Sequence, residues 1–326
     1  MKKNKTNKLS SENLIIKKYL KKLHFNKLGT FNFKNDAAYI KLKKNKKLVV
    51  TTDSISENID FFRNDDPRSI ATKLTTINLS DLSAMGVQPY TYSLNLFLPK
   101  YVDENWIKNF TSELFNIQKK YNFYLIGGDL SKSKLLSVSS TFFGYSKKNK
   151  IINQNSISIN NDIWITGTLG NSYMGLQILK KKINVSNNLN KYFSDKYYYP
   201  KPFIYGHELG KYVKSMKDIS DGFIADLSKM LDGRFGAKLN LNLIPLKSYL
   251  KRIQKKESLS ISSFLNCGDD YELIIISSKK QREKILNFAK KNKVMITRVG
   301  KVTKNLGILD DSNNPINIPR EFDHFS

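Results

Sequence analysis

Short apolar runs typical of β-strands alternate with amphipathic helical patterns along both halves of this 326-residue chain. Strands that alternate with helices favour α/β or α+β domains, in which helices cover a sheet. A polar, basic stretch at 146–155 separates the two halves, and the length also fits two domains. We therefore expect an N-terminal domain over 11–146 and a C-terminal domain over 147–326, after a disordered basic tail at 1–10.

Apolar periodicity predicts the individual elements of each half. The expected strands are 37–42, 48–52, 90–98, 123–126, 135–144, 162–166, 237–242, 270–277 and 294–300. The expected helices are 11–23, 68–86, 106–121, 171–181, 203–216, 221–232 and 280–291. Pro67 stands at the start of the second of these helices, where proline is favoured, and Gly86 ends it.

The chain carries a net charge of +27, since 55 lysines and arginines outnumber 28 acidic residues. The basic residues are scattered among many asparagines, so compositional drift at solvent-facing positions is the favoured explanation of the positive charge. An anionic substrate is the second explanation, and a nucleic-acid-binding surface is the third. The single cysteine, Cys267, excludes a disulfide framework and indicates a reduced, cytoplasmic setting. No run approaches the ~18 apolar residues of a membrane span, so we expect a soluble protein without a membrane partner.

Many of the acidic residues fall in short clusters, at the end of a predicted strand or within an apolar helix stripe. The clusters are Asn35-Asp36-Ala37-Ala38, Thr51-Thr52-Asp53, Asn78-Leu79-Ser80-Asp81, Gly127-Gly128-Asp129, Asp218-Ile219-Ser220-Asp221-Gly222 and Gly268-Asp269-Asp270-Tyr271-Glu272-Leu273. Each has an ordinary explanation when taken alone. Asp53 and Asp129 could be turn residues, Asp81 a buried aspartate paired with hydroxyls, and Ser220 a helix N-cap.

Taken together, six such clusters are hard to explain as separate caps and turns. Asp81 lies on a core-facing helix stripe with Leu74, Ile77 and Asn78, where a carboxylate is costly unless it is paired or bound to metal. Oxygen ligands of this kind suit Mg²⁺, and several Mg²⁺ ions between phosphates suit phosphoryl transfer. The chain has no P-loop and no protein-kinase motifs, and its three histidines are too dispersed for a zinc pair.

These strings resemble the thiamine-monophosphate kinase family, which shares a superfamily with aminoimidazole ribonucleotide synthetase and selenophosphate synthetase. The similarity extends from about Leu9 to Phe325, and the order of NLSDLSAMG, GGD, SDG and GDDYEL is specific. It implies a two-domain aminoimidazole ribonucleotide synthetase-like fold. An N-terminal mixed sheet with helices would bind ATP and metal and form a homodimer, and the C-terminal domain would be an α/β sandwich.

The resemblance also implies roles for individual residues. Mg²⁺ ligands would be Asp36, Thr51, Thr52, Asp53, Asp81, Asp129, Asp218 and Asp221. ATP contacts would be Gly127, Gly128, Ser220 and Asn155, and substrate contacts would be Asp60, Asp269 and Phe322. The chain departs from the family pattern at Asn35, which replaces one carboxylate, at Asp60, where a histidine is common, and at Asn155, which aligns roughly with an arginine.

The implied reaction is Mg²⁺-dependent transfer of the ATP γ-phosphate to thiamine monophosphate, giving thiamine diphosphate and ADP. A phosphate monoester has a second pKa of about 6, so the acceptor is largely ionised and no general base is expected. An aromatic ring and a carboxylate, here Phe322 and Asp269, suit the cationic thiazolium. Two alternatives stay open: another enzyme of the superfamily with a different acceptor, and a basic nucleic-acid-binding protein.

Overall fold

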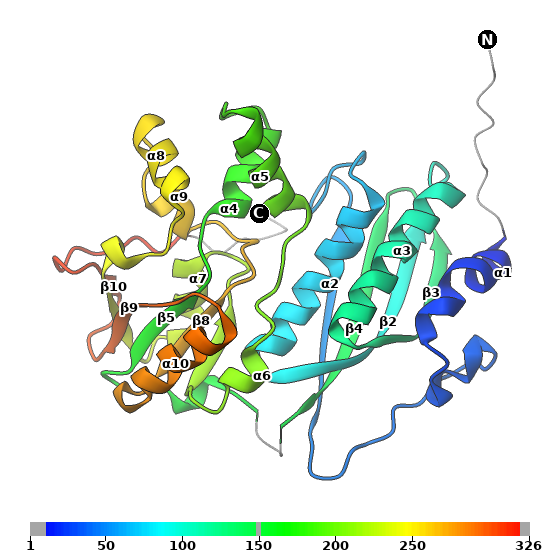
Figure 1. The fold of residues 1–326 in the computed structure, drawn as a ribbon, viewed down its shortest axis with the longest axis horizontal. Helices are drawn as coiled ribbons and strands as arrows, with labels where there is room; N and C mark the ends of the chain where they lie inside the picture. The colour runs from blue at the N-terminus through cyan, green and yellow to red at the C-terminus, as the bar shows by residue number, and fades with distance from the viewer. Residues whose placement is uncertain (1–10, 148–150, 320–326) are drawn as a thin grey trace. The chain divides into compact units, whose positions relative to one another are not determined.

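The computed structural model describes residues 11–147 and 151–319, which divide into two compact units (Figure 1). Of the described residues, the first unit contains 11–82 and 88–147, and the second contains 83–87 and 151–319. The predicted tail at 1–10 lies outside the described residues. None of the helices in the described ranges has the length and apolar character needed to cross a bilayer.

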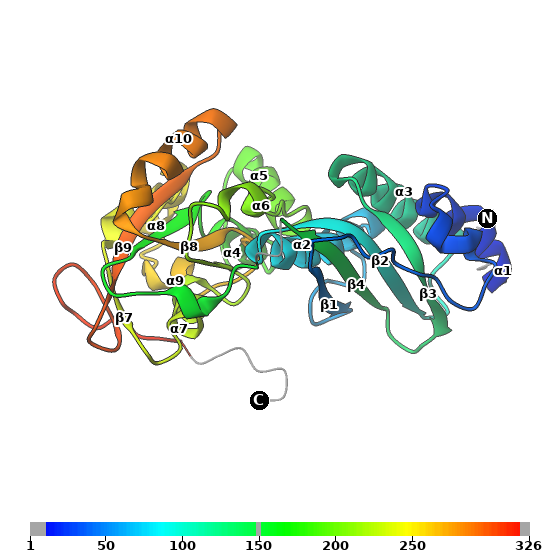
Figure 2. The ribbon, with the colours of Figure 1, turned by 90° about the horizontal axis from the view of Figure 1, so that it is seen from below.

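A four-stranded mixed sheet forms the centre of the first unit. Its strands are β1 (Leu48–Ser56), β2 (Val87–Leu98), β3 (Tyr124–Lys132) and β4 (Ser137–Ser146), in the order β1-β4-β2-β3. Strands β1 and β4 are antiparallel, whereas β2 and β3 are parallel. Helices α2 (Pro67–Ala84) and α3 (Glu104–Tyr121) cover one face of this sheet (Figure 2).

The strands separate a packed, helix-facing side from an open side, because side chains two positions apart share a face. On β1, Ile55 is buried on the helix side, while Val50 on the other side is 60% exposed. On β4, Val138 and Phe142 are buried, and Phe142 stacks on Tyr92 of β2 with ring centroids 4.8 Å apart. This alternation decides on which side of the sheet each strand residue of the candidate site lies.

The segment before β1 differs from the sequence-based expectation. The helix expected over 11–23 is present but irregular, because α1 (Glu12–Ile15) continues directly into the π-helical η1 (Ile16–Leu20) and the 3₁₀ turn η2 (Lys21–His24). A separate 3₁₀ segment, η3 (Leu28–Phe33), follows. The strand expected over 37–42 is wrong, since these residues pair with no strand. The Tyr145 hydroxyl donates instead to the Lys41 carbonyl, which ties the segment to β4.

A six-stranded mixed sheet forms the second unit, in the order β10-β7-β9-β5-β8-β6. Its strands are β5 (Asp162–Thr166), β6 (Ser215–Asp218), β7 (Gly236–Leu239), β8 (Leu273–Ser277), β9 (Ile296–Thr303) and β10 (Ile308–Leu309). Its helices are α4 (Asn171–Leu179), α5 (Asn187–Tyr198), α6 (Gly206–Leu209), α7 (Phe223–Leu231), α8 (Ser248–Lys256), α9 (Ser262–Leu265) and α10 (Arg282–Asn292). Ile274 on β8 packs with Leu227 of α7 in one core, and Ile275 packs with Phe288 of α10 in another. Both faces of the sheet are therefore covered, as expected for an α/β sandwich.

Four helices of the second unit differ from the sequence-based expectation. The predicted helix over 203–216 is wrong, because only the single turn α6 forms and strand β6 begins at Ser215. An added Cβ on Gly206 would lie 1.9 Å from the Ser83 carbonyl oxygen, so close backbone packing rather than helical periodicity decides this stretch. Helices α5, α8 and α9 had no prediction, although Leu250 and Ile253 of α8 are both buried and lie three residues apart, at helical spacing.

Candidate functional site

A pair of carboxylates lies between β1 and α2 on the helix-facing side of the first sheet. The Thr51 hydroxyl donates to Asp81 Oδ2 at 2.5 Å. Asp53 Oδ2 is buried and accepts no hydrogen bond from any residue that the structure describes. Burial, the negative charge of Asp81 and a hydrogen bond with Asp81 raise the pKa of Asp53 to about 7. The fold thus holds two acidic groups together at a site that disfavours the charge of Asp53.

The sequence-based expectation for the α2 stripe is confirmed by its packing. Leu74 and Asn78 are fully buried, and the Asn78 side-chain amide donates to the Leu74 carbonyl and to Ser140 Oγ of β4, both at 3.0 Å. Asp81 follows Asn78 on the same face of the helix, beside Thr51. The helix stripe that faces the sheet is therefore polar where it meets β1 and β4.

This pair has the chemistry that Mg²⁺ requires. Mg²⁺ takes oxygen ligands and keeps several waters, so one or two carboxylates and a hydroxyl suffice from the protein. Asp53, Asp81 and Thr51 offer such a set, and the buried oxygen of Asp53 lacks any other partner among the described residues. Within the described ranges, no group of three or more His, Cys, Asp or Glu side chains forms a metal cluster.

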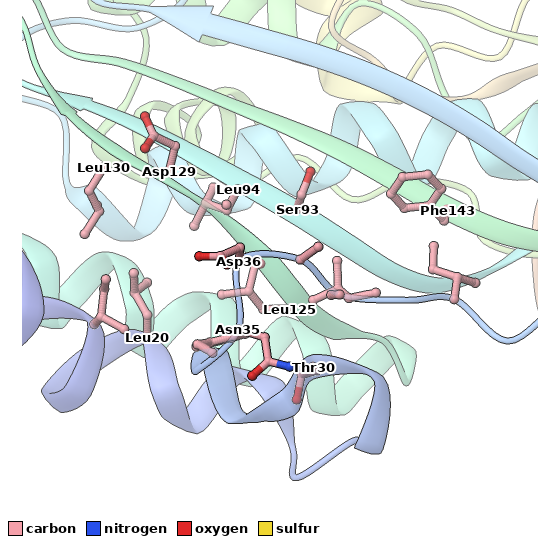
Figure 3. A pocket seen from close by; sticks show the side chains of 18 of the residues that line it. Leu20, Thr30, Asn35, Asp36, Ser93, Leu94, Leu125, Asp129, Leu130 and Phe143 are labelled. Atoms are coloured by element: carbon pink, nitrogen blue, oxygen red, sulfur yellow. The ribbon is translucent and has the colours of Figure 1, made fainter.

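A cavity of about 440 Å³ lies at the other edge of the same sheet (Figure 3). Asp36, Gly128 and Asp129 line it together with the apolar side chains of Leu20 and Phe143. Gly128 has a φ of +156°, and a Cβ there would lie 1.8 Å from the Leu94 carbonyl oxygen, so only glycine fits. Three predicted ligand-binding residues, and Gly127 beside them, therefore line one hollow.

The two groups of predicted ligands are separated within one chain. Asp53 lies on edge strand β1 and Asp129 on edge strand β3, three strand spacings or about 14 Å apart. Asp129 is paired in register with Asn95 of β2, whose neighbours Leu94 and Leu96 point to the helix side, so Asp129 lies on the open side. The structure thus brings Asp53 close to Asp81, and places Asp36 and Asp129 in the lining of one cavity, but it does not bring these two groups together.

Thr52 has the opposite orientation from Thr51. Its hydroxyl lies 3.0 Å from that of Thr141 on the open side of the sheet. Since successive side chains of a strand alternate between faces, Thr52 cannot direct its hydroxyl at the metal site that Thr51 lines. The hydroxyl of Thr52 is therefore not placed with the Asp53 carboxylate.

In the second unit, the predicted residue Asp218 ends β6, and residues 219–222, which include Ser220 and Asp221, form the loop between β6 and α7. Helix α7 begins at Phe223 with Gly222 as its N-cap, so the N-cap explanation for Ser220 is wrong. The backbone N–H groups of Ser220 and Asp221 donate to Asp226 Oδ2 at 3.0 and 2.9 Å. These N–H groups therefore face a buried carboxylate instead of an incoming phosphate.

The predicted substrate residue Asp269 lies directly against this loop. Its N–H donates to the Ser220 carbonyl at 3.2 Å, and its carboxylate accepts a hydrogen bond from the Tyr271 hydroxyl at 2.8 Å. A Cβ on Gly268 would lie 1.6 Å from the Ser220 carbonyl oxygen, so glycine permits this close approach. The structure therefore brings one predicted ATP contact and one predicted substrate contact side by side.

Two buried carboxylates next to this loop went unassigned in the sequence. Asp270 accepts hydrogen bonds from the N–H groups of Gly170 and Ser172 at 2.7 and 3.4 Å, and so caps α4. Glu272 accepts one from the Thr166 hydroxyl at 2.6 Å. Burial raises the pKa of each carboxyl to about 7. Acidic residues immediately before an apolar strand were the available signal.

The remaining predicted residues are placed as follows. Asp60 Oδ2 accepts the Ser56 N–H at 2.8 Å and closes the turn after β1, and Lys73 Nζ donates to the Asp60 carbonyl at 2.7 Å. Asn155 is exposed in the 3₁₀ turn η4 (Gln154–Ser156). Phe322 lies outside the described residues. The convergence of Asp218, Ser220, Asp221, Asn155 and Asp269 with the ligands of the first unit stays a prediction.

Comparison with protein families matches both halves of the chain. Residues 34–146 match the family model described as AIR synthase related protein, N-terminal domain, and residues 163–309 match the corresponding C-terminal domain. A thiamine-monophosphate kinase of Buchnera aphidicola subsp. Acyrthosiphon pisum is 36% identical over 319 residues, which cover 95% of this chain and 98% of the relative.

Two solved structures share the two-domain fold. The thiamine-monophosphate kinase of Stenotrophomonas maltophilia K279a superposes with a TM-score of 0.83 at 26% identity, covering 95% of this chain and 98% of that one. AaThiL complexed with AMPPCP and TMP superposes with a TM-score of 0.78 at 24% identity, covering 88% of this chain and 90% of that one. The fold expected from the sequence is therefore confirmed.

Proposed function

The chain belongs to the thiamine-monophosphate kinase family, and from this premise we propose that it transfers the γ-phosphate of ATP to thiamine monophosphate, giving thiamine diphosphate and ADP. The observation that carries the proposal is the pair Asp53 and Asp81, two carboxylates held together on the helix side of the sheet with a buried oxygen available to a cation. A buried carboxylate pair is costly without a counter-charge, and a cation between phosphates would supply that charge.

The residues of the chain have distinct tasks in this reaction. Asp53, Asp81 and Thr51 would hold Mg²⁺, which when bound would supply positive charge for the phosphate oxygens. Gly128 lets β3 approach the β2 backbone at Leu94 closely beside the cavity, and Asp269 would attract the thiazolium cation through its charge. No general base is needed, since the acceptor phosphate is already ionised at neutral pH, with a pKa of about 6.

A direct assay tests the proposal. Purified protein with ATP, Mg²⁺ and thiamine monophosphate should form thiamine diphosphate and ADP in equal amounts. Asp53→Asn and Asp81→Asn should each lower kcat by about a hundredfold or more, because each removes a charge that the phosphoryl transfer uses. Glu113→Gln, on the exposed side of α3, is the matched control and should keep full activity. ADP release without thiamine diphosphate would identify a different acceptor and reject the proposal.

We further propose a homodimer in which the two separated ligand groups meet across the interface. Asp53 and Asp129 lie on the two edge strands and on opposite faces, so a single sheet cannot direct both at one metal. An edge strand offers unpaired backbone groups, and the open face carries exposed apolar side chains such as Val50 and Phe97. A second copy placed with its β3 edge towards β1 would bring its Asp129 towards Asp53.

Subunit mixing tests this arrangement. Asp53→Asn and Asp129→Asn protein should each be inactive, but refolding them together in equal amounts should restore about a quarter of wild-type activity, since half of the dimers are mixed and each mixed dimer has one intact site. If both ligands came from one copy, every site in a mixed dimer would carry one substitution. Full inactivity of the mixture, with mixed dimers demonstrated by an affinity tag carried by only one of the two variants, would refute the shared site.

A further inference from the structure

We infer that Asp226 is a positioning residue that fixes the loop 219–222 for phosphoryl transfer. The inference rests on the proposed function and on the contacts predicted for Ser220 with ATP and for Asp221 with metal. Asp226 itself is fully buried on α7, away from any ligand that approaches from solvent. Its effect is exerted through the backbone of the loop.

The Asp226 carboxylate holds the backbone of the loop 219–222 in place through hydrogen bonds. Its Oδ2 accepts two consecutive backbone N–H groups, from Ser220 at 3.0 Å and from Asp221 at 2.9 Å. Its Oδ1 lies 3.4 Å from Lys217 Nζ, which compensates the buried charge. Because two adjacent peptide units are bound to one oxygen, neither can rotate without breaking a charge-assisted hydrogen bond.

Because the N–H groups of Ser220 and Asp221 point towards the buried Asp226, they determine which other atoms of the loop face solvent. The two donors that could bind a phosphate are occupied, so the loop offers its oxygen atoms, including the half-buried Asp221 carboxylate. In this structure Lys229 Nζ lies 2.9 Å from Asp221 Oδ2, on the same helix as Asp226. A cation therefore already pairs with Asp221, so this carboxylate is oriented where a positive group can reach it.

The hydrogen bonds of Asp226 also support the position of the predicted substrate residue Asp269. The Ser220 carbonyl accepts the Asp269 N–H, and Gly222, with a φ of +121°, leads the chain into α7. Loss of the bonds from Asp226 would release Ser220 and with it the neighbour Asp269. A displacement of about 1 Å at such positions is enough to cost about a hundredfold in rate.

Three substitutions separate positioning from mere support of the fold. Asp226→Asn keeps an oxygen that can accept both N–H groups, whereas Asp226→Ala and Asp226→Leu remove it. Leucine also fills the volume that the Asp226 side chain occupies, so this variant tests the loss of the oxygen even if the alanine variant does not fold. We expect the Ala and Leu variants to lower kcat/KM about tenfold or more and to raise the half-saturating Mg²⁺ concentration, with Asn within a few-fold of wild type. Activities are compared per folded molecule, measured by urea unfolding.

Two results would overturn the inference. One is an Ala or Leu variant that loses stability but keeps the wild-type Mg²⁺ dependence and kcat/KM. The other is rapid hydrogen exchange of the Ser220 and Asp221 amides in the wild-type protein, which needs no variant. Ser220→Ala and Asp221→Asn distinguish a failure of the proposed loop function from a failure of the positioning role of Asp226. If both variants are fully active, the loop has no role in the reaction. If both are impaired while Asp226→Ala is not, only the positioning role of Asp226 is refuted.

Discussion

Glu272→Gln should make the protein more stable at alkaline pH. Glu272 accepts the Thr166 hydroxyl, an interaction that a glutamine carbonyl preserves, and a Cβ on Gly167 would lie 1.7 Å from its carboxylate. Burial raises the pKa of Glu272 from 4.5 to about 7, although the Thr166 hydroxyl and the charge of Lys196 oppose this shift. The folded protein therefore resists ionising a group that the unfolded chain ionises freely.

The sign and size of the effect follow from these two pKa values. Since the folded pKa is the higher one, the unfolded chain releases its proton first, and stability falls as pH rises from about 4.5 to about 7. The difference of about 2.5 pH units corresponds to about 3 kcal/mol at 1.36 kcal/mol per unit. Glu272 is only half-buried as a whole residue, and solvent screening reduces this to about 2 kcal/mol.

Urea unfolding at pH 5, 6, 7 and 8 measures this effect. The free energy of unfolding of the glutamine variant should exceed that of wild type by about 2 kcal/mol at pH 8 and by much less at pH 5. Glu283→Gln, exposed in the first turn of α10, controls for the loss of one carboxylate and should change stability by only a few tenths of a kcal/mol. A difference that is independent of pH, or a glutamine variant that is less stable at pH 8, would refute the reasoning.

Three further predictions follow from other parts of the fold. Asp162→Ala should cost about 3 kcal/mol in chemical denaturation, because the fully buried Asp162 accepts two bonds from Arg282 at 2.7 Å and one from Arg298 at 3.4 Å; a loss below 1 kcal/mol would contradict this. Gly128→Ala should reduce both thermal stability and turnover, since its Cβ would clash with the Leu94 carbonyl oxygen. An alanine variant with the wild-type melting temperature and rate would contradict this prediction, because it would show that β2 and β3 can move apart without cost. Adding Mg²⁺ with ATP should raise the melting temperature and EDTA should reverse the rise, since a ligand stabilises by RT ln(1 + [L]/Kd); ATP that stabilises equally in EDTA would argue against metal-dependent binding.

Strong local patterns predicted most elements of the fold. The apolar stripe of α2, the alternation on β2 and β4 and the apolar run of β8 each reveal their element, because burial on one or two faces imposes a period on the chain. The same logic fails where tertiary contacts decide. Residues 203–216 read as a helix, yet Gly206 packs against the backbone at Ser83, and the chain then enters the sheet as β6.

For the candidate site, the sequence by itself determined the inventory of oxygen ligands and the family. The order and spacing of Asp53, Asp81, Asp129 and Asp269 are local properties of the chain, and the comparison with known proteins shows the family. It could not determine which side of a strand each ligand takes, or which edge each strand occupies, because strand order is set by pairings between residues far apart in sequence.

Only the tertiary structure decided how those ligands are grouped. It joined Asp53 to Asp81 through the packing of α2 on β1, placed Asp129 on the opposite edge strand, and put Asp226 beneath the loop that carries Ser220. The physical reason is that a carboxylate acquires its role from its burial and its partners, which arise when distant segments pack together.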